Sequence, residues 1–124
     1  MNPSIIRNQV GPRMSASAIC NNIVYLGGQV PLDTAHADIA TQTQEVLDRV
    51  DRLLLEAGSD KSHILQCQIF LVDIADIGAM NRVWDAWIPT GHAPPRATVQ
   101  TALADPRWRI EVLVTAAIAD NAPS

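Results

Sequence analysis

The sequence predicts an α+β domain with the element order ββαβαββ and two helices packed on one face of a mixed β-sheet. Two segments carry apolar residues at helical spacing, five others are strand-like, and Gly, Pro and Asn fall at the boundaries between them. At 124 residues and 13.4 kDa the chain has the size of one domain. We therefore expect a single domain over residues 1–124, with a core from about 11 to 119.

A β-hairpin is expected at the start of this fold. Residues 15–20 and 23–30 are typical of strands, and the Asn21-Asn22 pair between them tolerates the positive φ of a tight turn. Gly27 and Gly28 lie in the second strand, where a bulge or a close backbone approach is the ordinary reason for glycine. They lack the Gly-Lys-Ser/Thr continuation of a phosphate-binding loop.

The first helix is expected between Asp38 and Gly58, which is placed as a C-terminal glycine cap. Its apolar positions recur at helical spacing. They are Ile39, Val46, Leu47, Val50, Leu53, Leu54 and Ala57.

A strand from His63 to Asp73 and a second helix are expected next. Asp76 is placed to N-cap the helix and Pro89 to end it. The apolar face of the strand is predicted to consist of Leu65, Cys67, Ile69 and Leu71, with Gln66 and Gln68 on the other face. For Trp84 and Trp87 on the helix, core packing is the favoured interpretation, although one of them could line a cleft between subunits.

The last third of the chain contains two strands and the strongest candidate site residues. Residues 96–100 and 108–116 alternate polar and apolar side chains. If these strands fold back on each other about the loop of residues 102–106, Arg96 lies opposite Glu111 on one face. The pair is then either a structural ion pair or an anion-binding guanidinium beside an acid/base carboxylate, and both interpretations stay open.

The composition argues against several kinds of site. A net charge of −4, a pI of about 5.1 and a single lysine, Lys61, disfavour a nucleic-acid partner. His36, His63 and His92 lie far apart and neither cysteine has a CxxC companion, so we expect no metal. His92 stands in the loop that leads to Arg96, where a surface histidine is the favoured interpretation.

The cysteines and the N-terminus indicate a compartment. Cys20 and Cys67 lie in apolar strand-like runs, which is typical of small buried hydrophobes in a reducing environment and requires no disulfide. The N-terminal residues lack the apolar region of a signal peptide, and no stretch reaches the roughly 20 apolar residues of a membrane span. We expect a cytoplasmic protein with no membrane partner.

The predicted sheet has one face that its own helices do not cover. That face still carries apolar residues, and a small acidic monomer rarely leaves so much apolar surface in water. Oligomerisation would bury the open face and create clefts between subunits.

Several short motifs occur in the order of the predicted elements. They are Gly27-Gly28-Gln29-Val30-Pro31, Glu56-Ala57-Gly58, Ile69-Phe70-Leu71-Val72-Asp73, Asn81, Pro95-Arg96-Ala97-Thr98-Val99 and Ile110-Glu111-Val112. With these motifs the chain, from about residue 11 to 119, resembles the RidA family, also called YjgF or endoribonuclease L-PSP. The Pro-x-Arg run followed by Ile-Glu is the most specific of them.

The resemblance implies a chorismate mutase-like fold and a homotrimer with sites between subunits. It also implies a hydrolase that converts reactive enamines and imines, such as 2-aminoacrylate, to 2-oxo acids and ammonia. This is the reaction of a 2-iminobutanoate/2-iminopropanoate deaminase. A 2-imino acid is already electrophilic at Cα, so one bidentate arginine and one carboxylate suffice, and no cofactor or metal is needed.

The resemblance assigns roles to five residues. Arg96 matches the arginine that binds the substrate carboxylate, and Glu111 matches the glutamate that orients the attacking water. Thr98 matches a position whose backbone N–H assists carboxylate binding. Gly28 matches one whose backbone lines the pocket, and Asn81 matches a second-helix asparagine near the site.

The chain differs from the usual pattern of this family at two positions, and two other functions stay open. The family usually has tyrosine at the position of Met14 and serine at that of Gly27, so the substrate side chain stays open. One alternative is a non-catalytic trimer that binds small carboxylates as a sensor, or a chaperone-like protein. An endoribonuclease is disfavoured by the acidic charge. Glu111 favours the enzyme, because carboxylate binding needs only Arg96 whereas hydration also needs a base.

Overall fold

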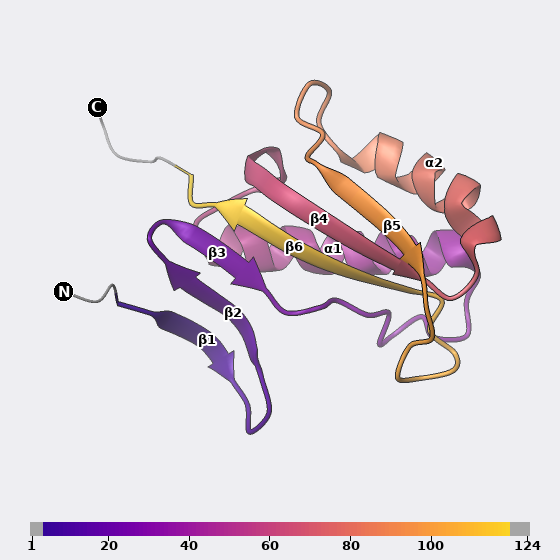
Figure 1. The fold of residues 1–124 in the computed structure, drawn as a ribbon, viewed down its shortest axis with the longest axis horizontal. Helices are drawn as coiled ribbons and strands as arrows, with labels where there is room; N and C mark the ends of the chain where they lie inside the picture. The colour runs from indigo at the N-terminus through magenta and orange to yellow at the C-terminus, as the bar shows by residue number, and fades with distance from the viewer. Residues whose placement is uncertain (1–3, 120–124) are drawn as a thin grey trace.

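The computed structural model describes residues 4–119, which form one six-stranded sheet with two helices on one of its faces (Figure 1). The α+β class and the packing of both helices on one face of a mixed sheet are confirmed. The elements are β1 (Ile6–Val10), β2 (Ser15–Cys20), β3 (Ile23–Leu26), α1 (Ile39–Glu56), η1 (Lys61–His63), β4 (Ile64–Leu71), η2 (Ile74–Asp76), α2 (Ile77–Trp87), β5 (Arg96–Gln100) and β6 (Ile110–Ala117).

The sheet has one strand more than the sequence predicted. Strand β1 precedes the expected core and pairs antiparallel with β2 at the edge of the sheet. Four of its five residues are exposed, so it carries little of the alternation by which a half-buried strand is recognised. Strand β3 is shorter than predicted, because it ends at Leu26 and only a single bridge, Gln29 to Val112, continues the pairing.

The order of the strands is β1-β2-β3-β6-β4-β5. Strands β4 and β5 are parallel, and helix α2 makes the crossover that a parallel pair requires. Strand β6 runs antiparallel between β3 and β4. The predicted hairpin of the last two strands is therefore wrong: β4 lies between β5 and β6 (Figure 1). Strand β6 has neighbours on both sides, and every second residue along it is buried, as expected for an inner strand.

Both predicted ends of α1 are confirmed. The Asp38 carboxylate accepts a hydrogen bond from the backbone N–H of Thr41 at 2.9 Å, which caps the first turn. Gly58 follows the helix with φ of +87°, a conformation that favours glycine. The Asn21-Asn22 turn also has the positive φ that its sequence predicted.

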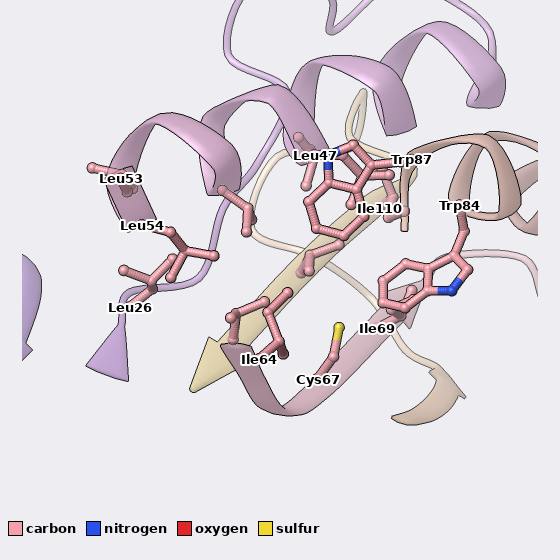
Figure 2. Packing of buried hydrophobic residues seen from close by; sticks show 14 of the residues in the cluster. Leu26, Leu47, Leu53, Leu54, Ile64, Cys67, Ile69, Trp84, Trp87 and Ile110 are labelled. Carbon is pink, nitrogen blue, oxygen red and sulfur yellow. The ribbon is translucent and has the colours of Figure 1, made fainter. Parts of the chain in front are cut away.

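The core lies between the two helices and the sheet. Figure 2 shows Trp84 and Trp87 of α2 in this cluster, together with Cys67 and Ile69 of β4. Trp84 is 5% exposed and Trp87 6%, which confirms the core interpretation of both. The strand prediction for Leu65 is wrong, since this side chain is 46% exposed. A register shift between residues 64 and 66 takes it off the core face.

Helix α2 begins after Asp76, as predicted, but the Asp76 carboxylate does not cap it. It accepts two hydrogen bonds from Nη2 of Arg109, at 2.8 and 2.9 Å. This ion pair joins the start of α2 to the residue before β6. Among residues 4–119 no helix is long and apolar enough to cross a membrane.

The face of the sheet opposite the helices carries exposed apolar side chains, as the sequence predicted. Tyr25 and Leu113 are exposed and alternate with buried core residues on their strands, and Val99 of β5 is exposed beside Phe70 of β4. Phe70 is half-buried on the same face. This open face is the apolar surface that an oligomer would cover.

Candidate functional site

Arg96 is the first residue of β5, an edge strand. It lies beside Cys67 of β4, a core residue, so its side chain leaves the sheet on the helix face. Its Nη2 donates a hydrogen bond to Oδ1 of Asn81 at 2.8 Å. Its Cζ lies 4.9 Å from the ring centroid of Trp84.

The Arg96 guanidinium has neutral partners. None of the salt bridges within residues 4–119 includes Arg96. An amide oxygen and an indole face orient the cation without neutralising it. The remaining N–H groups are therefore suited to a carboxylate ligand.

Thr98 lies two residues beyond Arg96 and leaves the sheet on the same face, opposite Ile69 of β4. The structure thus brings Arg96 and Asn81 together at the corner where β5 meets α2, with Thr98 on the same face of β5. These are three of the five residues singled out in the sequence.

Glu111 lies elsewhere. Its neighbours Ile110 and Val112 are buried in the core, so the Glu111 side chain points away from the helices, onto the open face. Its carboxylate rests against Gly28. A Cβ built on Gly28 would collide with Oε2 of Glu111 and lie 3.0 Å from its Cδ. Close approach of another residue is therefore the reason for glycine at this position.

The electrostatics of Glu111 suit a base. Burial raises the pKa of the Glu111 carboxyl above its ordinary value. No side-chain hydrogen bond in the described part of the chain involves this carboxylate. It can therefore accept a proton, or a hydrogen bond from water, without first losing a protein partner.

The prediction that Arg96 faces Glu111 is wrong. Arg96 is in register with Cys67 and Glu111 with Phe70, three residues further along the same strand. An odd offset places two residues on opposite faces of a sheet. This register also excludes an ion pair between Arg96 and Glu111 of the same chain. The candidate site is therefore divided into two parts, which we call half-sites: Arg96 with Asn81 and Thr98, and Glu111 with Gly28.

A cavity of about 390 Å³ lies beside Gly28, and Glu111 is not among the residues that line it. Gly28 lines it, as do Met14 and Gly27. Arg49 and Arg52 of α1 line it as well, which places the cavity on the helix side of the sheet. The cavity and the Glu111 carboxylate therefore lie next to Gly28 on opposite sides of the sheet.

The sequence predicted core packing for Trp84, with a cleft between subunits as the alternative for one of the two tryptophans, but not a contact with Arg96. A signal was available: Trp84 follows Asn81 by three residues and so shares its helix face. His92 is exposed and contacts the carbonyl oxygen of Thr90, which confirms a surface loop histidine.

Other chemistries find little support in the described residues. Cys20 and Cys67 are both free thiols. Burial raises the pKa of the Cys67 thiol to about 12, so it is a poor nucleophile. Between residues 4 and 119 no group of three or more His, Cys, Asp or Glu side chains could hold a metal ion.

The comparisons with known proteins all match the same family, and each match covers most of this chain. A family model described as Endoribonuclease L-PSP matches residues 10–118. A RutC family protein of Haemophilus ducreyi is 45% identical over 114 residues, 92% of this chain and 97% of that protein. A 3-aminoacrylate deaminase RutC of Acinetobacter baylyi is 36% identical over 97 residues, 74% of this chain and 76% of that protein. The crystal structure of a YjgF family member from Neisseria meningitidis has a TM-score of 0.87 and 42% identity, covering 94% of this chain and 97% of the other.

Proposed function

The chain belongs to the endoribonuclease L-PSP family, also called RidA or YjgF, and on that premise we propose that it is an imine deaminase. Its substrates are 2-aminoacrylate-type enamines and the corresponding 2-imino acids, such as 2-iminopropanoate and 2-iminobutanoate. Its products are 2-oxo acids and ammonia. A relative named as a 3-aminoacrylate deaminase supports this class of reaction.

One observation carries the proposal: Arg96 presents a guanidinium that is oriented by Asn81 and Trp84 yet has no carboxylate partner among residues 4–119. A guanidinium binds a carboxylate through two parallel N–H···O bonds, so it fixes both the position and the plane of a 2-imino acid. Thr98 lies on the same face and contributes its backbone N–H.

Glu111 supplies the base. The carboxylate accepts a proton from water as the water oxygen bonds to Cα and the C=N π electrons move to nitrogen. The proton then passes to that nitrogen, which gives a carbinolamine. Glu111 next takes the proton of the new hydroxyl group and passes it to the amino group, which leaves as ammonia while the C–N bond breaks and the Cα–O bond becomes a carbonyl. One water is consumed and Glu111 is regenerated, so neither an oxidant nor a cofactor is required.

Because Arg96 and Glu111 leave opposite faces of one sheet, the proposal requires a second copy of the chain. The Arg96 corner lies at the β5 edge, and the Glu111 carboxylate lies on the open apolar face. We place the β5 edge of one subunit against the open face of the next. A closed homotrimer repeats this contact three times and leaves no half-site unpaired.

A second candidate function has its own support. The separation of Glu111 from Arg96 within the chain favours a small-carboxylate sensor, for which the Arg96 corner alone is sufficient. The two functions differ in turnover, since a sensor binds 2-oxo acids without accelerating imine hydrolysis.

The deciding experiment measures imine lifetime. An amino-acid oxidase generates imino acids with a range of side chains, and semicarbazide traps whatever has not been hydrolysed. The deaminase lowers the trapped fraction relative to buffer for at least one imino acid. A protein that binds 2-oxobutanoate but accelerates no hydrolysis is a sensor instead.

A further inference from the structure

We propose that Trp84 is a positioning residue that holds the Arg96 guanidinium ready to bind a carboxylate. The inference rests on the proposed function only for the identity of the ligand. Trp84 would not touch the substrate; it would act through Arg96.

The first support is the geometry of the stack. The Cζ of Arg96 lies 4.9 Å from the Trp84 ring centroid, within the range of an attractive cation–π contact. The indole is itself immobile, because it is 5% exposed and packs against Trp87 with ring centroids 5.4 Å apart. A ring held in this way favours a guanidinium position over its face.

The second support is the contact with Asn81, one turn before Trp84 on the same helix. Its Oδ1 accepts one N–H of Arg96 at 2.8 Å. The ring attracts the cation to a position over its face and the amide binds one N–H group, so both the position and the rotation of the guanidinium are limited. A guanidinium has five N–H donors, and the contact to Asn81 uses one of them.

The third support is the neutrality of both partners. A carboxylate would orient the arginine equally well, but it would neutralise the charge and compete with the ligand. An aromatic face orients the cation and leaves its charge available. Preorganisation also removes the entropy cost of ordering a long side chain when the ligand binds.

The chain offers a matched control in Trp87. It lies one turn further along α2, is equally buried, and donates its indole N–H to Asp51 at 3.0 Å. Lys61, not Arg96, lies over its ring. Truncating Trp87 therefore disturbs the same core, including one packing partner of Trp84, but leaves in place the ring that lies beside Arg96.

The test compares Trp84→Leu, Trp84→Phe and Trp87→Leu by calorimetric titration with 2-oxobutanoate and by imine hydrolysis kinetics, with melting temperatures measured in parallel. Trp84→Leu is expected to raise Kd and KM about tenfold and to change kcat by less than about threefold, since it weakens binding of substrate and transition state alike. Trp84→Phe retains a π face and should recover most of the affinity. Trp87→Leu should melt earlier, with a smaller rise in Kd than Trp84→Leu, because the ring beside Arg96 is still present.

Equal losses of affinity in Trp84→Leu and Trp87→Leu, or no loss in Trp84→Leu, would overturn the inference. If Trp84→Leu does not fold, a fluorinated tryptophan at position 84, with Trp87 and Trp108 replaced by Phe, keeps the shape but weakens the π face. An unchanged Kd in that protein also overturns the inference.

Failure of the proposed function is distinguishable. If the wild-type protein binds no 2-oxo acid, the NMR signals of the Arg96 side chain decide, because a ring below the guanidinium shifts them upfield. A shift that Trp84→Leu abolishes and Trp87→Leu retains supports the positioning role. Unshifted signals in the wild-type protein overturn it.

Discussion

The Arg96 guanidinium and the Glu111 carboxylate differ in what surrounds them. Arg96 is held by two neutral groups, so its charge is free to bind an anion. Glu111 is partly desolvated against Gly28, which raises the pKa of its carboxyl and strengthens it as a base. Each residue is thus adapted to one half of the proposed reaction.

Replacing Arg96 by alanine should abolish binding of 2-oxobutanoate while the fold persists. A charge-assisted hydrogen bond to a carboxylate contributes about 1.5 to 3 kcal/mol, and no neighbouring cation replaces it. Arg96→Lys should recover only part of the affinity, because a lysine cannot form the bidentate pair. Calorimetric titration and thermal unfolding measure the two effects. Unaltered binding together with a large drop in melting temperature would make Arg96 a structural residue.

Replacing Glu111 by glutamine should separate binding from turnover. The amide keeps the size of the side chain but accepts no proton, so kcat should fall about 100-fold or more while 2-oxobutanoate still binds. Semicarbazide trapping and calorimetry report the two quantities. If Glu111→Gln remains active, the water is activated elsewhere, and His92 is the next residue to replace.

The pH dependence follows from the raised pKa of Glu111. The base form is lost as pH falls through that pKa, so the acid limb of kcat/KM in the wild-type protein should lie above the ordinary range of a glutamate. The same raised pKa lowers the stability of the fold at neutral pH, because burial disfavours the charged carboxylate in the folded state. This penalty disappears as pH falls below the pKa that Glu111 has in the unfolded chain. Glu111→Gln should therefore be at least as stable as the wild type at neutral pH. A lower melting temperature would contradict the desolvation argument.

At the scale of elements, two contacts set up the half-sites. Helix α2 presents Asn81 and Trp84 to the first residue of β5, and the segment after β3 brings Gly28 against β6. The loop before β6 is held by Gln42, a buried side chain of α1. Gln42 donates to the carbonyl of Arg107 at 3.0 Å and accepts the N–H of Arg109 at 2.7 Å. The strand that carries Glu111 therefore enters the sheet from an anchored point.

The contact between Gly28 and Glu111 makes an element-scale prediction. The backbone of Gly28 is not in the left-handed region, so Gly28→Ala strains no dihedral angle, but its new methyl group collides with the carboxylate. We expect kcat to fall by about tenfold or more as the base is displaced, because small misplacements of catalytic groups are costly.

The control for that experiment is Gly78→Ala in α2, where the nearest atom to the new Cβ is 4.0 Å away. Alanine is the better helix former, so this variant should be more stable by about 0.5 to 1 kcal/mol with unchanged kinetics. Denaturant unfolding and imine hydrolysis measure both proteins. Wild-type kcat in Gly28→Ala would show that the position of Glu111 is not critical.

At the scale of the whole molecule, the apolar open face and the divided half-sites have one joint explanation, which is the proposed homotrimer. Light scattering should give the mass of three chains at micromolar concentration, against 13.4 kDa for one. A monomer that hydrolyses imines would contradict the intersubunit site.

Mixing two inactive variants tests the shared site directly. A site between subunits takes Arg96 from one chain and Glu111 from the next, so Arg96→Ala and Glu111→Gln chains together rebuild some intact sites. Random assembly at equal amounts should restore about one quarter of wild-type activity. Unfolding and refolding the mixture permits exchange, and each variant refolded alone is the control. No recovery from mixed trimers would place both residues in one chain's site.

The sequence by itself determined the local structure and the chemical groups. Helix α1 with its start at Asp38 and its glycine cap at Gly58, the Asn21-Asn22 turn and the buried face of α2 depend on residues a few positions apart, so their patterns are visible in the sequence. The family and its fold were likewise recognisable from short motifs. The edge strand β1 was not predicted, because an exposed strand carries little periodic signal in its sequence.

Only the tertiary structure decided where those groups lie. Strand pairing joins residues far apart in the chain, and the alternation within a strand does not say which strand lies beside it. The placement of β6 between β3 and β4, with β5 parallel at the edge, put Arg96 and Glu111 on opposite faces. It also set Arg96 over Trp84. The sheet register, a property of the whole fold, thus turned an expected pair into two half-sites.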